Sequence, residues 1–151
     1  MSTSTEKRAA IEARIPHRPP FLLLDEIVEE GEDWALFRWT VPADADWFRG
    51  HYPEHPLTPG VLLTEHCIQG GAALIARVLA EREEEAPGVP VLTRIEDARY
   101  RRMVRPGETV ESRVEIVERV GPAYRMRAML TVEGKRTVTT AYVVTVAQEP
   151  A

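Results

Sequence analysis

The sequence has one cysteine, few aromatic residues, no long apolar run and no excess of basic charge. The lone Cys67 cannot form a disulfide within the chain, which suits a reducing compartment. No apolar run approaches the roughly 20 residues of a membrane-spanning helix, and residues 1–7 are too polar for a secretory signal. We therefore expect a cytoplasmic protein that does not insert into a membrane.

The charge balance argues against a nucleic-acid partner. The net charge is −5 and the isoelectric point is about 5.4, whereas nucleic acids are bound by basic surfaces. Hydrophobic residues make up 44% of the chain and charged residues 28%, the balance of a globular protein. A length of 151 residues fits one domain. We predict a single domain over residues 1–151, with flexible ends at residues 1–9 and 148–151.

The hydrophobic pattern predicts one long helix and several strands. From Gly60 to about Glu84, apolar residues cover most of a helix's circumference, which indicates a buried helix of about 35 Å. Strands with alternating apolar residues follow at 110–116, 124–132 and 138–146. The remaining predicted elements are a short helix from Ser4 or Thr5 to about Ala13 and strands at 21–29, 34–41 and 91–104.

These elements predict an α+β architecture. An antiparallel sheet of five or six strands would bury its apolar face against the long helix. A sheet wrapped around a central helix is the architecture called a hotdog fold. Gly70 and Gly71, inside the predicted helix, indicate that another element packs closely against it.

Three residues around the start of this helix are suited to acid–base chemistry. Glu65, near the second turn, has apolar neighbours, and burial would raise its pKa so that it holds a proton as a general acid must. His51 lies in the proline-rich loop 42–59, and an imidazole titrates near neutrality, as a general base should. Gly60 opens the helix, where free backbone N–H groups favour an oxyanion or a polarised carbonyl.

Each of these residues also has a structural explanation. Glu65 would also fit an ion pair with an arginine in a subunit interface, and a loop histidine such as His51 is often ordinary surface. Gly60 would also serve a turn that needs a small residue. The three types of group fall within 15 residues, from 51 to 65, and this combination favours a catalytic site.

Other kinds of site have little support in the sequence. His51, His55, His66 and Cys67 are close together, but their spacing matches no Cys-x-x-Cys or His-Glu-x-x-His pattern. Phosphate-loop and dinucleotide fingerprints are absent, as is a Gly-x-Ser-x-Gly elbow. We predict no metal site.

A basic segment follows the predicted helix. Between residues 94 and 105, five arginines and two acidic residues give a local charge of +3 on an acidic chain. This segment is either a solvated strand face or a docking patch for an anionic partner. The arginines that we consider for docking are Arg99, Arg101, Arg102 and Arg105.

Three parts of the sequence resemble one enzyme family. Around the candidate site the matching residues are Gly50-His51-Tyr52-Pro53, Pro56, Pro59-Gly60-Val61-Leu62, Glu65 and Gln69. Segments 15–25 and 95–108 carry further matches before and after it. In this order and spacing, residues 10 to 147 resemble the 3-hydroxyacyl-acyl-carrier-protein dehydratases of the FabZ type, in the FabA/FabZ hotdog family.

The resemblance implies a hotdog enzyme of fatty acid biosynthesis with its active site between two subunits. His51 would remove the α-proton of a (3R)-hydroxyacyl thioester on acyl carrier protein, and the partner subunit's Glu65 would protonate the departing hydroxyl. The Gly60 N–H would polarise the thioester carbonyl, with Val61 and Gln69 also binding substrate. The product is a trans-2-enoyl thioester. The implied assembly is a homodimer or a trimer of dimers, and no cofactor or metal is implied.

Two other functions are compatible with a hotdog fold. An acyl thioesterase would direct water at the thioester carbon with a carboxylate and would not need His51. A non-catalytic subunit that binds acyl chains would need neither His51 nor Glu65. The sequence also departs from the dehydratases after the glutamate, where His66 and Cys67 replace residues that are usually small or apolar.

Overall fold

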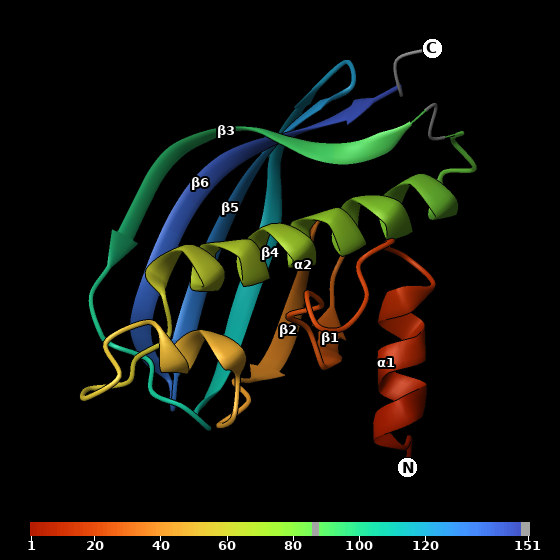
Figure 1. Cartoon of the computed structure of the whole chain (residues 1–151). Coiled ribbons are helices and arrows are strands. Elements are labelled where there is room, and N and C mark those ends of the chain that lie inside the picture. The colour runs from red at the N-terminus through yellow and green to blue at the C-terminus, as the bar shows by residue number, and fades with distance from the viewer. Residues whose placement is uncertain (86–87, 149–151) are drawn as a thin grey trace.

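A long helix, α2 (Gly60–Glu81), runs through the structure, and a curved sheet wraps around it (Figure 1). The computed structural model describes residues 1–85 and 88–148. The strands are β1 (Glu26–Glu30), β2 (Trp34–Thr40), β3 (Val89–Tyr100), β4 (Thr109–Val120), β5 (Ala123–Val132) and β6 (Lys135–Ala147). They lie in the order β1-β2-β4-β5-β6-β3, each antiparallel to its neighbours. The predicted α+β arrangement is confirmed, with six strands.

The core lies between α2 and the concave face of the sheet. Alternate residues of β5 and β6 are buried there, as their period-two pattern predicts. Gly70 lies so close to β2 that a Cβ atom would come within 2.8 Å of the Phe37 ring, and a Cβ at Gly71 would collide with the Tyr142 hydroxyl. The prediction of close packing at these two glycines is therefore confirmed.

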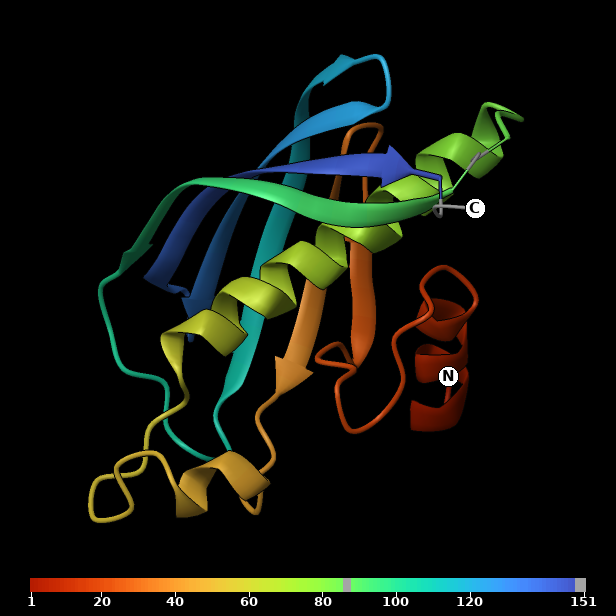
Figure 2. The ribbon, with the colours of Figure 1, turned by 45° about the horizontal axis from the view of Figure 1, so that its top comes forward.

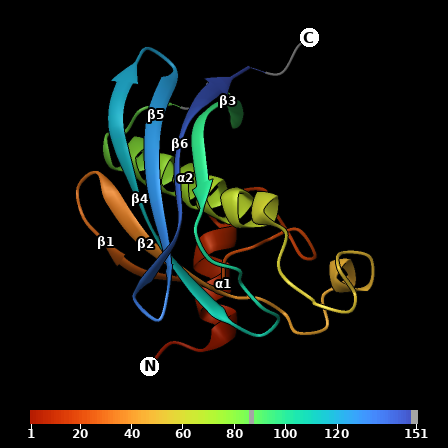
Figure 3. The same cartoon turned by 90° about the vertical axis from the view of Figure 1, so that its left-hand side faces the viewer.

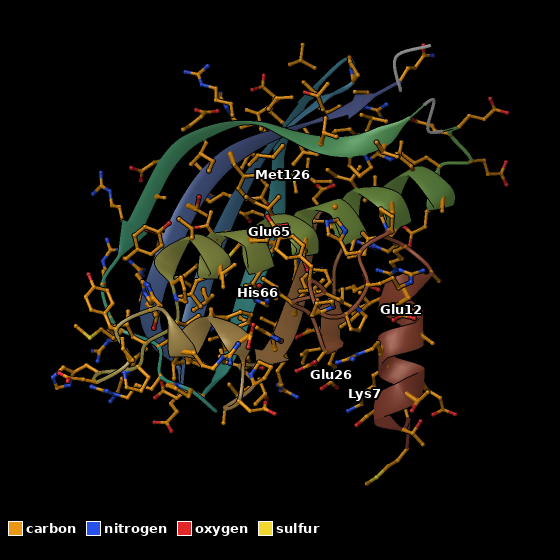
Figure 4. The ribbon with its side chains drawn as sticks, in the orientation of Figure 1. Lys7, Glu12, Glu26, Glu65, His66 and Met126 are labelled. Atoms are coloured by element: carbon orange, nitrogen blue, oxygen red, sulfur yellow. The ribbon has the colours of Figure 1, made fainter. Side chains whose placement is uncertain are left out.

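The two edges of the sheet differ. At the β1 edge, helix α1 (Ser4–Glu12) packs alongside, and Lys7 pairs with Glu26 at 2.9 Å (Figures 2 and 4). Thr3 and Glu6 form a capping box that starts this helix. At the other edge, β3 is 12 residues long and exposed along almost its whole length. Residues 4–9, in the segment expected to be flexible, thus form most of α1.

Two predicted strands have different limits in the structure. The strand predicted at 21–29 begins only at Glu26, because side chains of α2 take up backbone groups of residues 21–23 in place of a neighbouring strand. The strand predicted at 91–104 ends at Tyr100. The Val104 carbonyl then accepts a hydrogen bond from the Thr58 N–H at 2.6 Å, which joins the chain after β3 to the loop before α2.

The long loop predicted at 42–59 is confirmed and contains one short 3-10 helix, η1 (Asp46–Arg49).

No helix in residues 1–85 and 88–148 is long and apolar enough to cross a membrane.

Candidate active site

The loop before α2 presents His51. The N–H groups of Gly50 and His51 both donate to the Trp47 carbonyl, at 3.1 and 2.9 Å, so the chain turns sharply after η1. The His51 ring packs edge-on against Tyr52, with 4.9 Å between the ring centroids. The imidazole is partly exposed. Figure 3 shows this loop standing out from the body of the molecule beside the first turn of α2.

The start of α2 offers two backbone N–H groups. Pro59 is the N-cap, and its carbonyl accepts the N–H groups of Leu62 and Leu63 at 3.0 and 3.4 Å. Within the described chain, no hydrogen bond takes up the N–H of Gly60 or of Val61. These groups lie at the positive end of the helix dipole, which favours the polarised carbonyl of a ligand. The sequence prediction for Gly60 therefore has a matching geometry.

Gly60 is also required by packing. A Cβ atom at this position would come within 3.0 Å of Cε1 in the Tyr100 ring, from the end of β3. That distance is shorter than an ordinary van der Waals contact, so a side chain would displace the ring. The structural and the catalytic explanations of Gly60 are therefore compatible.

Glu65 lies in the second turn of α2 (Figure 4), and it has two polar neighbours. Its Oε1 accepts a hydrogen bond from Gln69 Nε2 at 3.2 Å and lies 4.0 Å from His17 Nε2. The side chain is 23% exposed. The expectation of a carboxylate surrounded by apolar residues was thus too strong, because an amide and an imidazole lie beside it. The alternative of an ion pair with an arginine in a subunit interface concerns a second chain; among the described residues of one chain, the ionisable partner of Glu65 is His17.

Gln69 joins this carboxylate to the N-terminal segment. Its Oε1 accepts the Leu23 N–H and its Nε2 donates to the Phe21 carbonyl, both at 2.8 Å. Gln69 itself is buried. One side chain therefore satisfies two backbone groups of a segment outside the sheet and also contacts Glu65.

His66 has a structural role that the sequence analysis did not predict. It is fully buried, with Nδ1 at 2.7 Å from the Leu23 carbonyl and Nε2 at 2.8 Å from the Ser112 hydroxyl. A carbonyl can only accept, so Nδ1 carries the proton and Nε2 accepts from Ser112. The Trp39 ring stacks on the imidazole, with 5.8 Å between centroids. Burial lowers the pKa of His66 to about 4, so this histidine is neutral.

His66 is therefore separate from the proposed chemistry. It leaves α2 on a different side from Glu65 (Figure 4). In the two described ranges, no group of three or more His, Cys, Asp or Glu side chains is placed to hold a metal ion. The departure at position 66 has a physical reason: the imidazole links α2 to both β4 and the segment that precedes β1.

No hydrogen bond or ion pair joins His51 to Glu65 among the described residues of the chain. His51 instead contacts Trp47 through its backbone N–H and Tyr52 through its ring, while Glu65 contacts Gln69 and His17. The His17 contact was missed from the sequence. The only signal for it in the sequence is that His17 lies in segment 15–25, one of the segments that resemble the dehydratase family.

The candidate docking arginines are exposed, as the docking hypothesis requires. Arg99 pairs with Asp97 at 3.2 Å, and Arg101 donates to the Thr139 hydroxyl at 3.1 Å. Arg102 and Arg105 line a surface hollow together with Lys135. The hydrogen bond between Thr58 and Val104 brings this basic segment next to the loop that carries His51.

Known proteins with similar sequences are dehydratases. The model of the FabA-like domain family matches residues 15–146. The 3-hydroxyacyl-[acyl-carrier-protein] dehydratase FabZ of Anaeromyxobacter sp. (strain Fw109-5) is 36% identical over 127 residues, which cover 83% of this chain and 80% of that protein. The protein of the same name in Staphylococcus aureus (strain JH9) is 38% identical over 123 residues, covering 80% and 81%.

Solved structures of hotdog proteins have the same architecture. The dehydratase heterocomplex ApeI:P from Xenorhabdus doucetiae matches with a TM-score of 0.78 at 16% identity, covering 92% of this chain and 91% of that chain. The PaaI protein from the phenylacetic acid degradation operon of E. coli matches with a TM-score of 0.64 at 15% identity, covering 93% and 90%. At these identities the likeness concerns the fold alone, and it confirms the predicted hotdog fold.

Proposed function

The chain belongs to the FabA-like family, and we propose that it is a 3-hydroxyacyl-[acyl-carrier-protein] dehydratase of fatty acid biosynthesis. It removes water from (3R)-hydroxyacyl thioesters and leaves trans-2-enoyl thioesters. The observation that carries this proposal is the arrangement at the start of α2. There, two free N–H groups precede a carboxylate that is held by Gln69.

The proposed reaction uses His51 as base and Glu65 as acid. His51 takes a proton from C2 of the substrate, and the electron pair shifts towards the thioester carbonyl. The Gly60 N–H, with Val61 beside it, stabilises the charge that develops on the carbonyl oxygen. The C2–C3 double bond then forms as the C3–O bond breaks, and Glu65 protonates the departing hydroxyl to give water. Because Gln69 donates to Oε1 of Glu65, Oε2 is the oxygen that carries this proton.

We place the site between two copies of the chain, because no hydrogen bond or ion pair joins His51 to Glu65 among the described residues of one copy. The exposed β3 edge supports a partner of the same kind. A strand of this length with unpaired backbone groups is a template for pairing with another strand. It also carries exposed apolar side chains, including Val91, at 39% exposed, and Ile95, at 49%. A homodimer joined through β3, alone or as part of a trimer of dimers, would bury them.

The carrier protein docks on Arg99, Arg101, Arg102 and Arg105 in this proposal. Their exposure and their position beside the His51 loop support this role. A carrier protein delivers its acyl group through a phosphopantetheine arm, so a basic surface beside the His51 loop attracts the anionic carrier and phosphate. The compartment that we propose is the cytoplasm, where the thiol of Cys67 stays reduced.

The first test is hydration of a short trans-2-enoyl thioester, followed by the loss of conjugated ultraviolet absorbance while free thiol is titrated in the same tube. Loss of absorbance without thiol release is the expected result. Release of thiol would instead indicate a hotdog acyl thioesterase. If neither signal changes with a pantetheine or with a carrier-protein substrate, the protein is an acyl-binding subunit and the proposal is wrong.

A further inference from the structure

We propose that Tyr100 is a positioning residue for the start of α2, acting through Thr64. The inference rests on the proposed function, in which the N–H groups of Gly60 and Val61 bind the thioester carbonyl. The reaction proposed above assigns no role to Tyr100 or to Thr64. Together they hold the helix turn that carries those N–H groups.

A chain of two hydrogen bonds runs from the sheet to the helix. The hydroxyls of Tyr100 and Thr64 lie 2.5 Å apart, and Thr64 Oγ1 donates to the Gly60 carbonyl at 3.3 Å. A hydroxyl has one proton and a carbonyl can only accept. Tyr100 must therefore donate to Thr64 when Thr64 donates to Gly60. Thr64 is only 3% exposed whereas Tyr100 is 47% exposed, so the Thr64 end of this link is the part that is shielded from water.

The ring and the hydroxyl of Tyr100 fix different parts of the turn. The ring packs against the Cα atom of Gly60, where a Cβ would come within 3.0 Å of it. The hydroxyl chain holds the Gly60 carbonyl, which belongs to the same peptide plane as the Val61 N–H. Rotation of that plane would turn the Val61 N–H away from a bound carbonyl. Tyr100 therefore holds both free N–H groups, that of Gly60 through its ring and that of Val61 through its hydroxyl.

Tyr100 is itself well placed to act as a fixed support. It is the last residue of β3 and lies opposite Val138 of β6 in the strand register. The next residue, Arg101, continues this pairing by donating its N–H to the Thr137 carbonyl at 2.8 Å. Glu65 follows Thr64 directly, so the proposed acid is attached to the same held turn. The hydrogen bonds from Tyr100 to Thr64 therefore connect the end of β3 to the N–H groups of Gly60 and Val61 and to the proposed acid, Glu65.

The test compares single-hydroxyl variants in the hydration assay. We expect Tyr100→Phe and Thr64→Val each to lower kcat about 10-fold with little change in KM, a smaller loss than removal of an oxyanion donor causes. The double variant should lose no more than either single variant, because both break one chain. Thr64→Ser keeps the hydroxyl and should retain near-normal kcat.

Tyr142→Phe is the matched control. The Tyr142 hydroxyl, from β6, also donates to a carbonyl of α2, that of Cys67, at 2.9 Å, but farther along the helix. This variant should keep normal kcat. If it loses as much as Tyr100→Phe, or if Tyr100→Phe keeps the wild-type kcat, positioning by Tyr100 is wrong.

Hydrogen–deuterium exchange separates this inference from the proposed function. Exchange in a peptide covering residues 57–64 should become faster in Tyr100→Phe and Thr64→Val but not in Tyr142→Phe. Unchanged exchange in the first two variants would contradict the proposal even in an active enzyme. A wild-type protein without hydratase activity, whose variants still show faster exchange, would leave the positioning role intact and reject the dehydratase.

Discussion

Gln69 Nε2 donates a hydrogen bond to Glu65 Oε1, one helical turn earlier on α2, at 3.2 Å. The same amide group holds the backbone of Phe21 and Leu23. The orientation of the proposed acid and the position of the N-terminal segment therefore depend on one buried side chain.

Replacing Gln69 by Leu should reduce both stability and turnover. The free energy of unfolding should fall by about 1–3 kcal/mol, because the Leu23 N–H and the Phe21 carbonyl lose their partner. Turnover should fall as well, because Glu65 loses the donor that fixes its Oε1. Urea unfolding and steady-state hydration measure the two effects. A stable variant with wild-type kcat would show that Gln69 does not orient the acid.

His51→Ala and Glu65→Gln should each lower hydration by at least about 10²-fold while the oligomer stays folded. Each variant removes one proton-transfer group, and both side chains are partly exposed, so little packing is lost. Initial rates and size-exclusion chromatography check the two parts of this expectation. Near-normal turnover in either variant would refute the role assigned to that residue.

Mixing the two inactive variants tests whether the site is shared. After unfolding and refolding together, about half of the dimers should contain one chain of each kind. Each mixed dimer then has one site with both His51 and Glu65 and one site with neither, so activity should return to about a quarter of the wild-type value. Each variant refolded alone is the control. If the mixture stays as inactive as its parts, both groups act within one chain.

Ile95→Lys should break the proposed contact between β3 strands. Ile95 lies in the middle of this exposed edge, and a charge there opposes pairing with a second copy. We expect a smaller species by light scattering and a loss of hydration. The control is Val120→Lys, at an exposed position where β4 ends. An active monomer would contradict a site built from two chains.

Much of the fold follows from local pattern in the sequence. The alternation in 110–116, 124–132 and 138–146 predicts β4, β5 and β6, since one face of each strand is buried against α2. The all-round apolar character of α2 likewise follows from its burial. Gly60 was predicted as an N–H donor because helix starts have such groups in any sequence.

The contacts of the site depend on tertiary structure and were harder to predict. Residues 21–24 have the composition of a strand, but Gln69 and His66, more than 40 residues later, take up their backbone groups. The environment of Glu65 depends on His17, which is distant in sequence. The link from Tyr100 to Thr64 likewise joins β3 to α2, and periodicity carries no information about it.

Acid should destabilise the fold through His66. Its folded-state pKa of about 4 lies below the ordinary value of 6.5, so the unfolded chain binds a proton more readily between these values. Stability should therefore fall as the pH drops from 7 to 5, by about 2 kcal/mol from this residue. Hydrogen bonding to Lys7 lowers the pKa of Glu26, and hydrogen bonding to Arg14 lowers the pKa of Glu30. The stabilisation from these two carboxylates is therefore lost only below pH 4.5, their ordinary pKa, which is outside this range.

Urea unfolding at several pH values measures this effect. His66→Gln should unfold more easily at pH 7 but show a flatter dependence between pH 7 and 5, because the titrating group is gone. His55→Gln, at an exposed loop position, is the control and should keep the wild-type slope. A full acid-induced loss in His66→Gln would assign the dependence to another group.

Reversing the charge of Arg101 and Arg102 should affect one substrate more than another. With both changed to Glu, kcat/KM should fall about 10-fold on an acyl carrier protein, because like charges oppose its approach, and little on a small pantetheine thioester. The difference should shrink as salt is added, since screening weakens exposed charges. Arg127→Glu, at a 66% exposed position on β5, changes the net charge without touching the patch and should leave both rates unchanged. Equal losses on the two substrates would place the arginines in folding or catalysis and reject the docking role.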